Sequence, residues 1–67
     1  MKVARVQKDP ETGYVVVQTN VGRLLVAETK NAQPGDFPMG APLKEAWSGA
    51  WCCKYVSPDR AWLLRPL

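Results

Sequence analysis

The chain is built from short runs of Val, Leu and aromatic residues, separated by clusters of Pro, Gly, Asp, Asn and Ser. Runs of about four to eight such residues, bounded by turn-forming residues, are typical of β-strands. We therefore expect five or six short strands. The candidate segments are residues 2–7, 14–19, 23–29, 43–47, 50–56 and 61–65.

The turns in the first half of the chain carry the strongest local signals. In Asp9–Gly13, Pro presets the φ angle of the first central position, and Gly accepts the left-handed conformation that closes a bulged hairpin. Residues 20–22, Asn-Val-Gly, form a second tight turn. Residues 2–29 are therefore predicted to form a three-stranded meander.

Residues 43–47 permit two interpretations, a strand or a helical turn with its apolar side chains on one face. We favour the strand. A two-residue hairpin at Ser48–Gly49 then places residue 44 opposite residue 53. A further turn at residues 57–60 leads into the last strand.

A Pro- and Gly-rich segment, residues 30–42, interrupts the strands and is too rich in turn residues for regular structure. Phe37 and Met39 lie between its prolines. Two roles are open for this pair: they fold back to close one end of a barrel, or they contact a partner, because extended Pro-rich segments are preordered for recognition.

Taken together, these segments predict an all-β fold in one domain, residues 1–67. Short strands with strong turns favour a small five- or six-stranded barrel, SH3-like or OB-like, with one long Pro-rich loop. A domain of 67 residues buries only about 60% of the surface that its unfolded chain exposes. Association with other chains is therefore expected to help stabilise it.

The second half of the chain is rich in large aromatic residues, with Trp47, Trp51 and Trp62 close together. A small domain rarely buries several Trp side chains completely, so we expect at least one to meet a partner; the alternative is that all three belong to the core. The predicted partner-binding residues are Phe37, Met39, Trp47, Trp51 and Tyr55. The expected partner is a protein, either further copies of this chain or a larger assembly.

Nine Lys and Arg against six Asp and Glu give a net charge of +3, but the basic residues are evenly spread. Even spacing favours a solvated surface over a nucleic-acid stripe, which requires clustering. The alternative function is a nucleic-acid-binding barrel in which aromatic rings stack on bases. Its phosphate contacts would come from Arg23, Lys44 and Lys54.

Catalytic and metal-binding chemistry is not indicated. The chain has no His, the commonest general base and metal ligand. Cys52 and Cys53 are adjacent, so we expect two separate thiols and no zinc site. Asp9 and Asp36 are interpreted as turn residues whose carboxylates bond local N–H groups. We expect a non-enzymatic protein without cofactors.

No apolar run approaches the roughly 20 residues needed to span a bilayer. The N-terminal sequence Met-Lys-Val-Ala-Arg has no apolar core of a signal peptide. The sequence therefore predicts a soluble protein without membrane contact, located in the cytoplasm.

Overall fold

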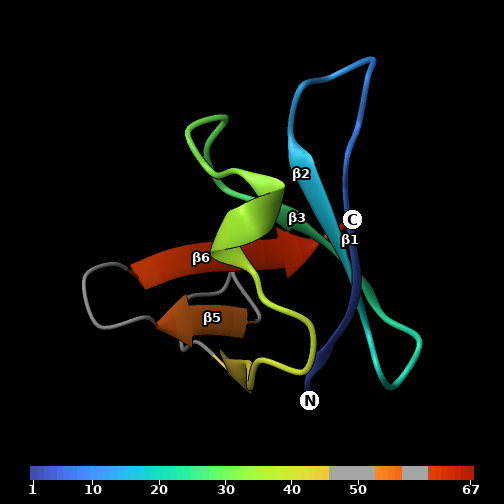
Figure 1. Ribbon diagram of the computed structural model, residues 1–67, viewed down its shortest axis with the longest axis vertical. Coiled ribbons are helices and arrows are strands. Elements are labelled where there is room, and N and C mark those ends of the chain that lie inside the picture. Colours follow the sequence, from blue (N-terminus) through green and yellow to red (C-terminus); the bar gives the residue numbers. More distant parts are fainter. Residues whose placement is uncertain (46–52, 57–60) are drawn as a thin grey trace.

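The computed structural model describes residues 1–45, 53–56 and 61–67 (Figure 1). This part of the chain is mostly β and forms an antiparallel sheet with the strand order β1-β2-β3-β6-β5-β4. One short 3-10 turn, η1, lies between β3 and β4. The elements are β1 (Val3–Lys8), β2 (Val15–Thr19), β3 (Leu24–Ala27), η1 (Pro34–Asp36), β4 (Lys44–Glu45), β5 (Cys53–Val56) and β6 (Ala61–Pro66).

The predicted meander over residues 2–29 is confirmed, and its first turn is held by the expected residues. The Asp9 amide donates to the Tyr14 carbonyl and the Gly13 amide donates to the Asp9 carbonyl, both at 2.8 Å. Gly13 has a φ of 79°, in the left-handed region that a residue with a Cβ avoids. The Asp9 Oδ1 accepts the Glu11 amide at 2.9 Å, as a turn residue should.

The second turn is organised by Thr19, a polar residue that is only 2% exposed. Its Oγ1 accepts the Arg23 amide at 3.1 Å and the Val21 amide at 3.4 Å. Its carbonyl accepts the Gly22 amide at 3.1 Å, and Gly22 has a φ of 82°. The buried hydroxyl is therefore satisfied by the turn that it stabilises.

A β-bulge in β1 decides which side chains enter the core. Val3 pairs with Thr19, but Arg5 pairs with Gln18, so one extra residue stands in β1. Strict alternation would send Val3 and Val6 to opposite faces, whereas the bulge lets Val3 be buried and Val6 pack against the core. The core residues are Val3, Val15, Val17, Leu25, Ala27, Ala32, Phe37, Ala41, Leu43 and Leu64.

The strand favoured over residues 43–47 is present as β4, but its predicted register is wrong by one residue. Lys44 pairs with Lys54 and Glu45 with Cys53, whereas the expected hairpin placed residue 44 opposite residue 53. The Ser48–Gly49 turn itself lies outside the described residues.

The connection between β3 and β4 is more regular than expected, because Pro34–Asp36 forms a 3-10 turn. Proline suits the first position of a helical turn, where its missing N–H is not needed. The Asp36 Oδ2 accepts the Gln33 amide at 2.8 Å, which confirms Asp36 as a turn residue. Phe37 follows directly and is 1% exposed, with its ring centroid 6.4 Å from that of Trp62.

The end of this connection pairs with the start of the chain. The Val3 amide donates to the Ala41 carbonyl at 2.9 Å, and the Leu43 amide donates to the Met1 carbonyl at 2.8 Å. Lys2 and Pro42 form an antiparallel bridge. The segment before β4 therefore lies beside the start of β1, as Figure 1 also shows near the N-terminus.

Candidate interaction face

The predicted partner-binding residues do not form one exposed surface among the described residues. Phe37 is buried, in agreement with the first of its two possible roles, in which it folds back onto the domain. Met39, in contrast, is 69% exposed. Trp47 and Trp51 lie outside the described residues. Tyr55 is placed only as a backbone position of β5, opposite Trp62.

Phe37 is buried because the backbone on either side of it is fixed. Its amide donates to the Pro34 carbonyl at 3.2 Å, and the Ala41 amide donates to the Pro38 carbonyl at 3.0 Å. The two turns direct Phe37 toward partly buried Trp62, with the rings tilted by 52°. Trp62 thus packs against the core, in agreement with the core alternative for this one Trp.

The bases predicted for phosphate contact are partly brought together. Lys44 and Lys54 occupy directly paired positions of β4 and β5. Arg23 lies between β2 and β3, and β6 separates β3 from β5 in the sheet. The Tyr14 ring, one of the aromatic groups that could stack on bases in the alternative function, is covered on one face by Lys30, whose Nζ is 5.4 Å from the ring centroid. Of the three predicted phosphate-contacting residues, only Lys44 and Lys54 therefore occupy neighbouring positions.

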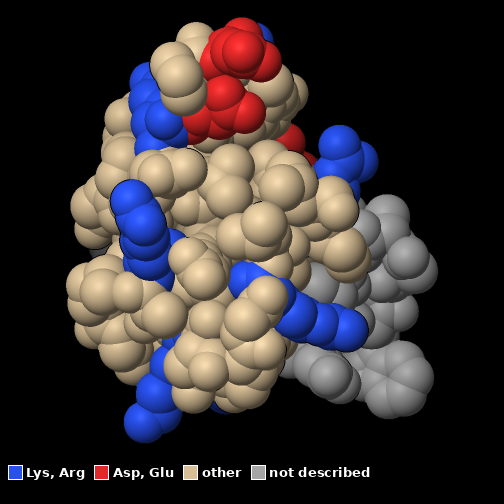
Figure 2. Space-filling view, turned by 90° about the vertical axis from the view of Figure 1, so that its right-hand side faces the viewer, with Lys and Arg blue, Asp and Glu red and all other residues tan. Residues whose placement is uncertain are grey.

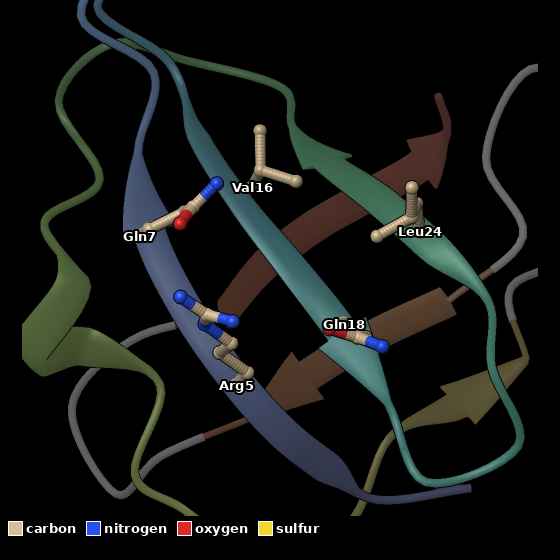
Figure 3. Close-up of a pocket in the computed structure, with 5 residues that line it drawn as sticks. All are labelled: Arg5, Gln7, Val16, Gln18 and Leu24. Carbon is tan, nitrogen blue, oxygen red and sulfur yellow. The ribbon is translucent and has the colours of Figure 1, made fainter.

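The clearest surface feature is a shallow hollow on the solvent side of the first three strands, which we call the β1–β3 groove (Figure 3). Its volume is about 210 Å³. All five labelled side chains lie on the same side of the sheet. The residues that line it are Arg5, Gln7, Val16, Gln18 and Leu24.

The strand register explains this arrangement. Arg5 pairs with Gln18, which pairs with Leu24, so a cation, an amide and an aliphatic side chain form one row across three strands. The neighbouring row runs from Gln7 to Val16 and on to Val26. Because side chains two positions apart share a face, both rows point away from the core on which Val15 and Val17 pack.

The chemistry of the β1–β3 groove suits recognition by hydrogen bonds and apolar contact. The Arg5 guanidinium offers several N–H donors in a planar fork that matches a carboxylate. Gln7 and Gln18 add amide donors and acceptors. Leu24 is 48% exposed, and the Leu67 amide donates to its carbonyl at 3.1 Å, so the exposed C-terminal Leu67 lies beside the groove.

The volume of the groove limits what it can hold. Small-molecule sites usually measure about 300–1,000 Å³ and enclose most of their ligand. The groove, at about 210 Å³, is smaller, and it therefore suits one inserted side chain of a partner better than a whole ligand. Within the described parts of the chain, no group of three His, Cys, Asp or Glu side chains could hold a metal ion.

The distribution of charge differs between the two ends of this surface. Figure 2 shows Asp and Glu side chains gathered toward the end where the β1–β2 turn lies in Figure 1, while Lys and Arg are scattered. Asp9 and Glu11 belong to this turn. The acidic β1–β2 turn and the β1–β3 groove are therefore two chemically distinct features of the three-stranded meander.

The β1–β3 groove was not among the sites predicted from the sequence, although the alternation of polar Arg5 and Gln7 with apolar Val6 is a signal of a polar outer face. Over the ranges that the structure describes, no helix has the length and apolar character required to cross a membrane. Comparisons of this chain with protein-family models, with curated proteins and with solved structures find no match.

Proposed function

We propose that this chain is a non-enzymatic protein–protein interaction module that associates with copies of itself. The observation that carries the proposal is the β1–β3 groove, which combines half-exposed Leu24 with the Arg5 guanidinium and two amides. Arginine and aliphatic anchors surrounded by hydrogen-bonding groups are common at the centres of protein interfaces.

The size of the domain supports this proposal independently. A domain of 67 residues buries only about 60% of the surface that its unfolded chain exposes, so its own core is small for a free-standing fold. Removing exposed apolar surface from water stabilises by about 25 cal/mol per Å² before the costs of association are subtracted. Covering Leu24 and Leu67 in an assembly would therefore stabilise the fold.

We also propose that the sheet closes into a small barrel of the SH3-like or OB-like type. The support comes from the hydrogen bonds that join Met1 and Val3 to Leu43 and Ala41, because β1 and β4 are the two ends of the strand order. Closure would remove both edges of the sheet and leave its outer face for binding.

A cytoplasmic location stays a prediction from the sequence.

Sedimentation velocity over a wide range of protein concentrations tests the self-association. The wild type should form larger species as concentration rises, and Leu24→Ser should shift the midpoint of assembly to higher concentration. Val21→Ser is the matched control, because Val21 is also exposed but does not line the groove. A wild type that stays monomeric at every concentration would contradict self-association.

Nucleic-acid binding is the second candidate, favoured by the direct pairing of Lys44 and Lys54. Two paired positions and a separate Arg23 would neutralise few phosphates, so affinity for single-stranded DNA or RNA should be weak at physiological salt. Titration of a fluorescent oligonucleotide at several salt concentrations measures this. A sub-micromolar complex that weakens steeply with salt would place this candidate first.

A further inference from the structure

Resting on the proposed self-association, we infer that the β1–β3 groove of one copy receives the β1–β2 turn of a second copy, with the Glu11 carboxylate on the Arg5 guanidinium. The two features have complementary charge and shape. The turn is a narrow projection at the end of the hairpin, and the groove is a shallow hollow with room for about one long side chain (Figures 1 and 3).

The turn is ordered before any contact is made. Two hydrogen bonds between backbone groups of Asp9, Gly13 and Tyr14 close it, and the Asp9 carboxylate is already engaged with the Glu11 amide. The Glu11 side chain is exposed, and among the described residues no hydrogen bond or ion pair involves its carboxylate. A preordered turn loses little conformational entropy on docking, so a small contact suffices.

The charges around the groove favour an acidic guest. Its lining contains Arg5 and no carboxylate. A guanidinium flanked by the amides of Gln7 and Gln18 can donate several hydrogen bonds to one carboxylate.

The charges around the turn set the strength of the contact. Lys8 ends β1 next to the turn, and Lys30 lies over the Tyr14 ring. These bases reduce the net charge of the turn, so attraction depends on the local pair of Glu11 with Arg5. Association should therefore be weak, and it should weaken further as salt screens the charges.

The contact joins two different patches of the same chain, so two arrangements satisfy it. In a two-fold dimer, the turn of each copy enters the groove of the other, whereas head-to-tail contacts continue into a closed ring or an open filament. Sedimentation velocity distinguishes them, because only the head-to-tail arrangement forms species larger than a dimer.

A charge exchange tests the pairing on the full chain. Arg5→Glu and Glu11→Lys should each weaken self-association about tenfold or more, and the double variant should recover to within about threefold of the wild type, measured by sedimentation velocity. The matched controls are Arg23→Glu and Glu28→Lys, which make the same charge changes outside the lining and the turn. Melting temperatures of all variants check that each one folds.

The outcomes separate the two proposals. If the wild type stays monomeric, the self-association of the proposed function fails, and this inference fails with it. If the wild type assembles but neither single variant changes assembly, the proposed function stands and the turn-to-groove contact is overturned. The direct pairing of Glu11 with Arg5 is supported if both single variants weaken assembly, the double variant recovers it and the two controls leave it unchanged.

Discussion

Phe37 illustrates how one side chain completes this small core. It is the largest of the fully buried side chains among the described residues and lies against Trp62. Phe37→Ala should lower the free energy of unfolding by about 3–5 kcal/mol, because it removes buried apolar surface and leaves a cavity. Denaturant unfolding measures the loss.

Such a loss approaches the whole stability of a domain this small, so Phe37→Leu serves as a milder second variant that should stay folded with reduced stability. Met39→Ala is the control within the same loop. Because Met39 is mostly exposed, its removal should change stability by no more than about 0.5 kcal/mol. Equal effects at the two positions would contradict the core role of Phe37.

At the residue scale, Gly22 and Gly35 distinguish the effect of backbone conformation from the effect of the space available for a side chain. An added Cβ would meet no atom within 4 Å at either position, but only Gly22 has a φ in the left-handed region, at 82°. Gly22→Ala should therefore cost about 1–2 kcal/mol, whereas Gly35→Ala should be neutral or slightly stabilising. Thermal unfolding of both variants checks the difference, and equal melting temperatures would refute it.

At the scale of elements, the bulge at the start of β1 controls the whole strand. Deleting Ala4 would make Val3 and Arg5 direct neighbours, so strict alternation alone would keep Val3 opposite Thr19 on the core side and Arg5 opposite Gln18 on the solvent side. We therefore expect the deletion to lower the free energy of unfolding by no more than about 1 kcal/mol, less than the roughly 1.5–3 kcal/mol of burying one Val side chain. Hydrogen exchange should show that the Val3 amide stays protected.

Ala4→Ser is the control for this deletion, because it keeps the number of residues and so the bulge. It should retain the protection of the Val3 amide, whose acceptor is the Ala41 carbonyl. Loss of this protection in the deletion variant alone would contradict the prediction and show that Val3 needs the bulge itself to stay in the core.

The turns and strand pairings also show how much of the fold can be predicted from the sequence. Turns with Gly at a left-handed position, as at Gly13 and Gly22, could be predicted because few other residues adopt that conformation. The pairing of β4 with β5 was missed by one residue, because the Ser-Gly signal is weak and neither face of these strands is purely apolar. The β1–β3 groove was missed because it depends on the register of three strands at once.

At the scale of the molecule, self-association predicts a melting temperature that rises with protein concentration. A partner present at about 100 times its dissociation constant stabilises the folded state by about 2.7 kcal/mol. Calorimetry of the wild type and of Leu24→Ser over a range of concentrations measures the effect. The variant should lose the dependence, and a wild type without any dependence would count against assembly.

The hydrogen bonds of Met1 and Val3 with residues 41–43 have a consequence for the order in which the molecule folds. The β1–β3 meander pairs neighbours along the chain, so its loops close quickly, whereas these bonds and the β3–β6 pairing join segments far apart in sequence. Closing long loops costs more entropy and slows folding. The meeting of the two halves of the sheet should therefore limit the rate of folding, after the meander has formed. Substitutions within the turns of the meander should then change the rate of unfolding less than they change the rate of folding.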